Sequence, residues 1–478
     1  MSTTTDTYKC FIGGEWTDAA SGETMEVIAP ATGERIAEVP RCGAEDVDRA
    51  VAAAAKALPE WLEQTPKRRS ELLYALADVI EENAEELAQL ESLNVGKPLL
   101  ASRDEMPFGA DNLRFFAGAA RNLEGKSAGE YIAGYTSLIR REPLGIVAGI
   151  CPWNYPLMMA IWKMGPALAA GNVQIMKPSE QTPLSLLRLV QLAQDVIPEG
   201  VLQVVTGDGV PAGQRLVEHP DVRLVSLTGD VDTGKAIART AADTLKRVHL
   251  ELGGKAPMVV FDDADPEAVA AGIRLAGYWN SGQDCTAGSR VLAGPKIYDA
   301  LLEALVPQVE SLKVGDPLND ETEMGSVISQ AQQERILGFL ERAEKATVVT
   351  GGGSGSDKGF FVQPTIVTDV GQEDEIVQRE VFGPVVTVQR FADDAQAIEW
   401  ANGVRYGLAA SVWTRDVGRA MNAVRRLQFG TVWVNDHLLP ISSELPHGGY
   451  KQSGYGKDMS IYSMEEYTQI KHVAIKLA

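Results

Sequence analysis

The sequence predicts an α/β fold with a parallel, doubly wound, Rossmann-like sheet in its first half. Between residues 146 and 252, short apolar runs of β type alternate with stretches of helical periodicity, and a second alternating series starts at Pro257. This alternation is typical of parallel sheets, because the chain crosses back over the sheet as a helix between two parallel strands. Ligands bind such sheets beyond the carboxyl ends of the strands, so we expect functional residues in the loops that follow them.

The expected elements follow one another along the chain. Residues 8–40, with many Gly, Pro and Thr, are predicted to form short strands and turns. From Ala44 to Leu93 the apolar residues take a helical period, and Pro59 and Pro66 are predicted to break this stretch into at least two helices. The elements expected next are a helix over 104–123, an extended hairpin over 125–143, and strands at Ile146–Ile150, Val173–Met176, Leu202–Val205, Leu224–Leu227, Pro257–Phe261, Val291–Ala293, Pro364–Val367, Val385–Val388, Val432–Val434 and Tyr467–Ile475.

Length and charge restrict the possible functions. The chain has 478 residues, which is more than a single common domain, so two or more domains are expected. Its 44 Lys and Arg against 65 Asp and Glu give a net charge of −21, which argues against nucleic-acid binding because that binding needs basic side chains. No apolar stretch approaches the roughly 18 residues of a membrane-spanning helix. The N-terminal stretch shows no secretory signal.

The spacing of cysteine and histidine is typical of a reduced, intracellular protein. The four cysteines form no C-x-x-C pair, so no disulfide scaffold is expected; they are Cys10, Cys42, Cys151 and Cys285. The five histidines show no H-x-x-x-H pattern, so no metal site is expected. We therefore expect a cytoplasmic protein with no membrane or nucleic-acid partner.

Three residues near expected strand ends and loops have the chemistry of a covalent catalytic site. Cys285, in NSGQDCTAGSR, is surrounded by small and polar residues, where a nucleophile and a structural cysteine are equally compatible with the local sequence. Glu251, in HLELGGKAP, is suited to a general base, although a solvated carboxylate is the commoner role. Asn154 follows Pro-Trp and has an amide that can donate to an oxyanion or cap a helix.

One further motif imitates a phosphate-binding loop. Residues 229–235 read GDVDTGK, with the G-x-x-x-x-G-K spacing of such a loop. Ala236 stands where the loop needs Ser or Thr to hold magnesium, and Asp230 and Asp232 would place negative charge beside a triphosphate. A nucleotide triphosphatase is therefore disfavoured, and an ATP hydrolysis assay would reveal one.

Seven short motifs occur in one order along the chain. They are PWNYP at 152–156, KPSE at 177–180, LTG at 227–229, ELGGK at 251–255, GQDC at 282–285, EVFGP at 380–384 and SGYGK at 453–457. Each is weak alone, but together they resemble the aldehyde dehydrogenase superfamily along nearly the whole chain. The closest likeness is to its aminoaldehyde and betaine-aldehyde branch, especially the bacterial 4-aminobutyraldehyde dehydrogenases.

The resemblance implies oxidation of an aldehyde to an acid through a thiohemiacetal and a thioester on Cys285. It implies that the Asn154 amide and the Cys285 backbone N–H stabilise the oxyanion, and that Glu251 activates the water that hydrolyses the thioester. The chemistry agrees with this order, because a thiolate is a strong nucleophile and a thioester is readily hydrolysed.

The resemblance also implies that NAD is the cofactor. Lys177 and Glu180 match positions at the adenosine ribose. Glu180 would accept hydrogen bonds from the 2′-hydroxyl and repel a 2′-phosphate, which favours NAD over NADP. The other matching positions are Glu380 at the nicotinamide ribose, Phe382 lining that pocket, Trp153 flanking the cofactor and Gly229 close to the pyrophosphate.

The chain departs from the family pattern at three acidic positions. Asp230 stands where a Ser usually contacts the pyrophosphate, so we do not expect a contact there. Asp458 stands where many members carry a Glu that relays protons, and its shorter side chain is expected to act only through water. Asp284 precedes the nucleophile, and its charge would raise the pKa of the thiol if it pointed inward.

Three aromatic residues match the cation-binding box of the branch. They are Tyr155, Trp162 and Trp279, whose ring faces would attract an ammonium group; core packing is the alternative for any one of them. His447 replaces the Trp that is typical of plant betaine-aldehyde enzymes.

Two carboxylates favour a substrate that carries a primary amine. Glu105 corresponds to an acidic position that pairs with the amine, and Asp284 is placed to assist. We therefore expect a primary aminoaldehyde such as 4-aminobutanal, with betaine aldehyde or a broad range of aldehydes as alternatives.

The resemblance divides the chain into domains and excludes two alternatives. It implies an NAD-binding domain at 1–121 and 144–253, a catalytic domain at 254–453 and an oligomerisation arm at 122–143 and 467–478, so a homodimer or homotetramer is expected.

Glu251 argues against a CoA-acylating enzyme, which usually lacks this base. An inactive structural relative is disfavoured because Cys285, Glu251 and Asn154 are all present.

Overall fold

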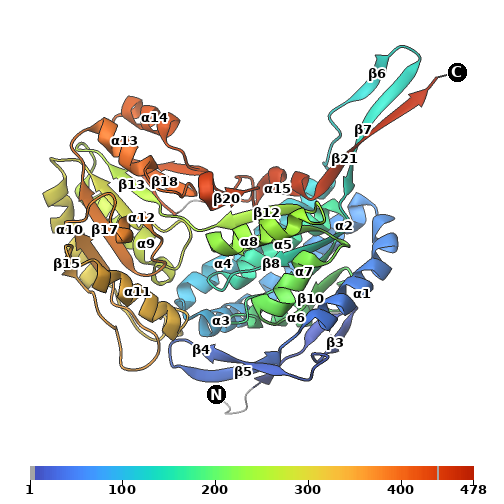
Figure 1. Ribbon diagram of the computed structural model, residues 1–478, viewed down its shortest axis with the longest axis horizontal. Helices are drawn as coiled ribbons and strands as arrows, with labels where there is room; N and C mark the ends of the chain where they lie inside the picture. Colours follow the sequence, from blue (N-terminus) through green and yellow to red (C-terminus); the bar gives the residue numbers. More distant parts are fainter. Residues whose placement is uncertain (1–5, 439–440, 478) are drawn as a thin grey trace.

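Two lobes and a projecting arm make up the computed structural model, which describes residues 6–438 and 441–477 (Figure 1). One lobe carries the sheet around β8 (Ile146–Ile150), and the other carries the sheet around β13 (Pro257–Val260). No helix in the two described ranges is both long and apolar enough to cross a bilayer.

An eight-stranded sheet forms the first lobe. In spatial order its strands are β20 (Gly454–Tyr455), β12 (Arg247–Leu252), β11 (Val222–Gly229), β8, β9 (Val173–Lys177), β10 (Leu202–Val204), β2 (Cys10–Ile12) and β3 (Glu15–Thr17). The strands from β12 to β10 are parallel. The chain adds β9 and β10 on one side of β8 and then returns to add β11 on the other. This confirms the predicted doubly wound fold and places a crevice beyond the carboxyl ends of β8 and β11.

Helices cover this sheet, and their sequences explain where they begin and end. Helices α1 (Ala44–Leu62) and α5 (Pro156–Ala170) both pack on β8 and β9. Every residue of α5 is buried, because its sequence is apolar all round. The remaining helices of the lobe are α2 (Pro66–Glu82), α3 (Ala84–Val95), α4 (Leu99–Ala120), α6 (Leu184–Ala193), α7 (Gln214–Glu218), α8 (Val231–Ala242) and α15 (Ser460–Glu466).

The predicted helix break at Pro59 is wrong, whereas the break at Pro66 is confirmed. Pro59 lies inside α1, close to its end, where the loss of one N–H donor is tolerated. The chain breaks instead before Pro66, where the Thr65 side chain accepts a hydrogen bond from the Arg68 N–H and caps α2. The helix expected over 104–123 begins earlier, at Leu99.

A seven-stranded sheet forms the second lobe. In spatial order its strands are β15 (Thr347–Thr350), β16 (Thr365–Thr368), β17 (Val385–Arg390), β14 (Arg290–Ala293), β13, β18 (Ala409–Trp413) and β19 (Thr431–Val434). The sequence analysis missed β18, whose Ala-Ala-Ser start has little β character. The helices of this lobe are α9 (Pro266–Tyr278), α10 (Tyr298–Glu310), α11 (Gln330–Arg342), α12 (Glu375–Gln378), α13 (Asp394–Asn402) and α14 (Val417–Arg426).

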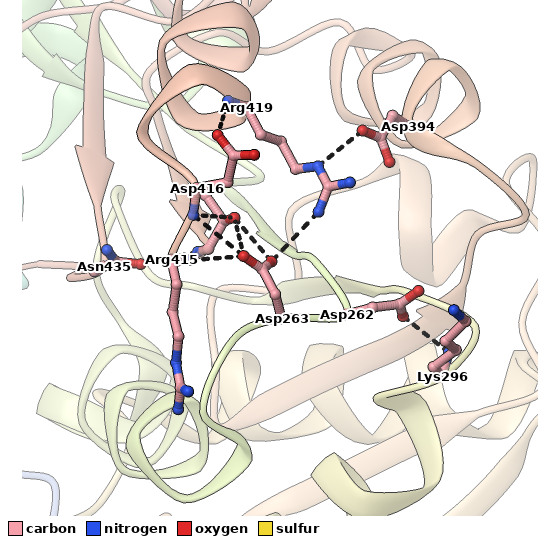
Figure 2. A network of polar contacts seen from close by, with 9 residues as sticks. Asp262, Asp263, Lys296, Asp394, Arg415, Asp416, Arg419 and Asn435 are labelled. Carbon is pink, nitrogen blue, oxygen red and sulfur yellow. Dashed lines mark hydrogen bonds and ion pairs between the residues drawn. The ribbon is translucent and has the colours of Figure 1, made fainter.

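A polar network around Asp263 joins the loops that follow β13 and β18 (Figure 2). The Asp263 carboxylate accepts hydrogen bonds from the Thr414 hydroxyl at 2.8 and 2.9 Å, and from the backbone N–H groups of Arg415 at 2.9 Å and Asp416 at 3.2 Å. Arg419 lies 3.4 Å from Asp263 and donates to Asp394 at 3.0 Å, which ties α14 to α13. The network therefore links the loops after two neighbouring strands of this sheet to α13 and α14.

The arm consists of three antiparallel strands that extend away from the first lobe (Figure 1). The hairpin expected over 125–143 is confirmed as β6 (Ala128–Ile132) and β7 (Tyr135–Pro143), and the expected C-terminal strand is confirmed as β21 (Thr468–Lys476), which pairs with β7. A separate small sheet near the N-terminus contains β1 (Asp6–Thr7), β4 (Thr24–Ala29) and β5 (Glu34–Pro40).

Candidate active site

One cavity of about 1170 Å³ lies at the carboxyl edge of the first sheet and reaches the second lobe. Every site residue that the sequence predicts lines this cavity: Glu105, Trp153, Asn154, Tyr155, Trp162, Lys177, Glu180, Gly229, Glu251, Trp279, Asp284, Cys285, Glu380, Phe382 and His447. Residues far apart in the sequence are therefore brought together in one place. Among the described residues no cluster of His, Cys, Asp and Glu side chains is arranged to hold a metal ion.

Cys285 is the half-exposed cysteine of the chain, whereas Cys10, Cys42 and Cys151 are buried. It follows a short turn, η2 (Trp279–Gly282), in which Asn280 has a φ of 49° and Ser281 a φ of 56°. Burial raises the pKa of the Cys285 thiol well above its usual value, and the charge of Asp284 adds to the effect. Loss of the proton is therefore harder for this thiol than for an exposed cysteine.

The two glycines after Glu251 let the backbones of the two lobes approach closely. A side chain at Gly254 would collide with the carbonyl oxygen of Cys285, and one at Gly253 would collide with the carboxylate of Glu380. The ELGG turn therefore allows the end of β12 to approach both the loop that carries Cys285 and Glu380 of the second lobe.

Asn154 is fixed to the loop that carries Cys285. Its side-chain Nδ2 donates to the Gln283 carbonyl at 3.0 Å, and the Asn280 side chain donates to the Asn154 carbonyl at 2.9 Å. An amide nitrogen carries two hydrogens, so one N–H of Asn154 remains to donate to an oxyanion. The side chain is buried, which strengthens such a bond because water is excluded.

Glu251 is buried on β12, and neither of its carboxylate oxygens has a hydrogen-bond partner in the described part of the chain. Burial raises its pKa well above the usual value, and the nearby charge of Asp458 raises it further. A carboxylate without donors holds its proton more tightly and is a stronger base than an exposed one. A side chain at Gly448 would collide with Glu251 Oε1, so this glycine leaves room for the carboxylate.

Asp458 lies beside Glu251 with two cationic or protonatable neighbours. Its Oδ2 is 3.5 Å from Lys163 Nζ, and its Oδ1 is 3.4 Å from His249 Nε2. Lys163 also donates to Thr228 at 2.7 Å. All of these side chains except Thr228 are buried. The charge of Asp458 is therefore poorly screened by water, and it raises the pKa of Glu251.

The opposite end of the cavity contains the predicted cofactor residues. Lys177 Nζ lies 3.8 Å from Glu180 Oε2 and donates to the Pro178 carbonyl at 2.9 Å. Asp230 lines the cavity, but its carboxylate already has hydrogen-bond partners within the protein. It caps α8 by accepting hydrogen bonds from the N–H groups of Asp232 at 2.8 Å and Thr233 at 3.1 Å.

The cavity is also lined by Glu380, Trp153 and Phe382. Glu380 Oε1 accepts a hydrogen bond from the Gly254 N–H at 2.8 Å, and burial raises its pKa to about 7. The rings of Trp153 and Phe382 meet edge to face, with their centroids 5.2 Å apart. These contacts fix the side chains that the resemblance assigns to the nicotinamide end.

At the substrate end, Tyr155 joins Asp284 to a buried ion pair. Its hydroxyl donates to Asp284 Oδ2 at 2.7 Å, and Lys97 Nζ lies over its ring, 4.7 Å from the centroid. Lys97 also pairs with Oε1 of Glu105, so the carboxylate expected to bind a substrate amine already has an internal cation. Glu105 Oε2, in contrast, is buried without a partner in the described residues. The ring centroids of Trp162 and His447 lie 5.1 Å apart, with the ring planes tilted by 53°.

The sequence analysis missed three residues that support the site. Lys97 gave no local signal. His437 is buried, and its Nε2 lies 2.8 Å from the carbonyl oxygen of Thr286, the residue that follows Cys285. His249 lies two residues before Glu251, and the alternation of side chains along a strand would have placed both on one face of β12.

The model of the family described as "Aldehyde dehydrogenase family" matches residues 16–473. The chain belongs to this family. A betaine aldehyde dehydrogenase of Sinorhizobium fredii is 42% identical to it over 97% of this chain and 96% of the relative. The family identity agrees with the cavity, which is lined by residues from six of the seven motifs.

Two solved structures extend this likeness to the cofactor. An aldehyde dehydrogenase of Bacillus cereus in complex with NAD+ superimposes with a TM-score of 0.97 at 42% identity, covering 99% of this chain and 97% of that chain. A betaine aldehyde dehydrogenase of Staphylococcus aureus in complex with NAD+ gives a TM-score of 0.96 at 40% identity, covering 98% and 95%. The protein is an NAD-dependent aldehyde dehydrogenase.

Proposed function

We propose that this aldehyde dehydrogenase oxidises a short aminoaldehyde, 4-aminobutanal in the first place, to the corresponding acid. The observation that carries the proposal is that a thiol, an amide donor and an unpartnered carboxylate line one cavity, from Cys285, Asn154 and Glu251. Nucleophile, oxyanion donor and base are the groups that oxidation of an aldehyde through a thioester requires.

The reaction begins when the Cys285 thiol gives its proton to solvent and the sulfur attacks the aldehyde carbon. The free N–H of Asn154 and the backbone N–H of Cys285 donate to the oxygen of the thiohemiacetal. Hydride then leaves the substrate carbon for the nicotinamide, which is the chemistry that bound NAD supplies, and a thioester remains on Cys285. Glu251 takes a proton from water, whose oxygen attacks the thioester carbon, and the acid leaves as the thiolate is restored.

The residues at the other end of the cavity fit NAD. The side chain of Glu180 is 43% exposed, so its carboxylate is free to accept hydrogen bonds from a ribose and to repel a 2′-phosphate. Lys177 would bind the same ribose, Gly229 allows the pyrophosphate to approach, and Glu380 would hold the nicotinamide ribose. Trp153 and Phe382 would flank the ring.

The substrate end supports a cationic aldehyde. Trp162, Trp279 and Asp284 line the same cavity, and Glu105 Oε2 lacks a partner among the described residues. A primary ammonium could therefore be bound by both an aromatic ring and a carboxylate oxygen. Because Lys97 already occupies Glu105 Oε1, we assign the free Oε2 and Asp284 to the amine.

Betaine aldehyde is the second candidate, with a broad range of aldehydes as the third. Relatives named betaine aldehyde dehydrogenase, from Sinorhizobium fredii and Rhizobium etli, are 42% and 41% identical to this chain. A trimethylammonium group has no N–H to donate, so it would depend on the aromatic faces alone.

A panel of 4-aminobutanal, betaine aldehyde and butanal with NAD and NADP tests this assignment by kcat/KM. We expect the highest value for 4-aminobutanal with NAD. Glu105→Ala should reduce the preference for 4-aminobutanal over butanal about tenfold, and an unchanged preference would refute the role of Glu105. Cys285→Ala should abolish NADH formation, whereas Cys10→Ala, which removes a buried thiol, should not.

We also propose that the domains follow the boundaries set out above and that the arm mediates assembly into a homodimer or homotetramer. Large apolar side chains are exposed along its strands, among them Tyr131 at 67% and Ile470 at 65%. Burial in a partner would remove this surface from water. Light scattering of the purified chain and of Ile470→Glu tests the proposal, and a monomer for the unaltered chain would overturn it.

A further inference from the structure

A general base that takes a proton from water in every turnover must return that proton to solvent. Glu251 is 3% exposed and has no hydrogen-bond partner among the described residues, so it has no direct route to bulk water on the protein side. A second protonatable group that lies near both Glu251 and a more exposed side chain would give this proton a route that does not pass through the substrate cavity.

His249 occupies that position. Its Nε2 lies 3.8 Å from Glu251 Oε1, and its Nδ1 lies 2.9 Å from Glu466 Oε2. The imidazole is 1% exposed, whereas the side chain of Glu466 is 35% exposed at the end of α15. One ring therefore lies between a buried carboxylate and a carboxylate in contact with solvent, and neither of its nitrogens makes a hydrogen bond with another described residue.

The packing around this ring leaves room for it. Gly456 has a φ of +97°, and a side chain there would lie 2.9 Å from the His249 ring and 2.8 Å from Glu466 Oε2. Gly448 gives the same freedom to Glu251. The charged groups facing this cluster are Asp458, 3.4 Å from His249 Nε2, and the lysines Lys163 and Lys457, which interact with Asp458 and Glu251.

We propose that His249 and Glu466 form the proton exit of this enzyme, with His249 positioned to discharge Glu251 after each deacylation. This inference rests on the proposed role of Glu251. The proton taken from water moves from the Glu251 carboxyl to His249 Nε2, directly after a rotation of Glu251 or through one bridging water. After a small rotation of the ring, the Nδ1 proton passes to Glu466 Oε2 and then to solvent. Loss of the Nε2 proton to water and uptake of a proton from water at Nδ1 restore the first tautomer. No electrons are transferred, and Glu251 is again a carboxylate.

The test compares the first turnover with the steady state in the full enzyme, using 4-aminobutanal and butanal with NAD. In His249→Ala, NADH formed in the first turnover should change less than about twofold, whereas the steady-state rate should fall about tenfold or more, because only deacylation needs the base to be discharged. Intact-mass analysis of quenched samples should show an acyl group accumulating on Cys285.

Added imidazole separates proton transfer from packing. Imidazole should restore the steady-state rate of His249→Ala in proportion to its concentration and leave the unaltered enzyme unaffected. His249→Gln, which fills similar space without an acid–base group, should show the same slow deacylation and serves if the Ala variant folds poorly.

Glu466→Gln should slow deacylation less than His249→Ala, since water can replace an exposed carboxylate. Its matched control is Glu465→Gln, the preceding residue of α15, whose carboxylate pairs with Arg141 at 3.0 Å.

Normal deacylation in both His249 variants, or a defect that imidazole does not relieve, would overturn the proposal. If the unaltered enzyme forms no NADH in its first turnover, the proposed function fails instead, so the two failures are distinguishable.

Discussion

Glu251 and Asp263 are acidic residues at the ends of consecutive strands, one in each lobe, and their surroundings are opposite. Asp263 accepts hydrogen bonds from the Thr414 hydroxyl and from the backbone N–H groups of Arg415 and Asp416 (Figure 2). Glu251 accepts none from the described residues. Partial burial opposes ionisation of Asp263, but the hydrogen bonds outweigh it and hold its pKa below the usual value, whereas burial raises the pKa of Glu251.

The difference separates a structural carboxylate from a reactive one. Donors stabilise the charged form of Asp263, so that its charge holds two loops together at little cost. The charge of Glu251 is not stabilised, so this carboxylate gains more from taking up a proton. Removing the carboxylate charge should therefore damage catalysis at one position and stability at the other.

The largest effect should follow from Glu251→Gln. We expect kcat to fall at least about a hundredfold, because the amide cannot accept the proton of the attacking water. Formation of NADH in the first turnover should persist, as stopped-flow absorbance at the NADH band will show. An equal loss in the first turnover and the steady state would mean that Glu251 acts before hydride transfer.

Asp263→Asn should have the reverse consequence. We expect the free energy of unfolding to fall by about 1–2 kcal/mol, because the amide loses charge-assisted hydrogen bonds, while kcat stays within about twofold. The shift of the urea midpoint measures the loss. Since the folded pKa of Asp263 is depressed, its contribution is present above the unfolded pKa and disappears as the pH falls through the folded pKa. The difference between the two proteins should therefore shrink in acid.

A smaller effect is expected at the nucleophile. Asp284→Asn should lower the pH at which Cys285 reacts with iodoacetamide, because the charge of Asp284 adds to burial in raising the pKa of the thiol. The pH profile of the alkylation rate measures the change. A profile identical to that of the unaltered enzyme would mean that burial alone sets the pKa of Cys285.

The smallest effect concerns stability at Glu251 itself. Its folded pKa is raised, so the folded state holds this proton more tightly than the unfolded chain does. The unaltered protein should then lose stability, relative to Glu251→Gln, as the pH rises above the unfolded pKa of a carboxyl group. Melting temperatures at pH 5 and pH 9, roughly the two sides of that range, should show a larger advantage for the variant at the higher pH.

The sequence predicted the fold class, most strands of both sheets and the residues that line the cavity. Strand β8 has the predicted bounds Ile146–Ile150, because an apolar run between turn residues is a strong local signal. Proline predicted helix boundaries less well, because α1 continues past Pro59 to Leu62. Strand β18 was missed because tertiary pairing with β13 and β19, not local propensity, makes Ala409–Trp413 a strand.

The order of the seven motifs indicated the family. The resemblance to that family then assigned catalytic roles to Cys285, Glu251 and Asn154. Only the tertiary structure decided which polar groups have partners. In the fold, Lys97 forms an ion pair with Glu105, and Asp230 caps the N-terminus of α8. Glu251 lies near His249 and accepts no hydrogen bond from the described residues. The physical reason is that hydrogen bonding and burial depend on distances between segments remote in sequence, and those distances set the reactivity of a carboxylate.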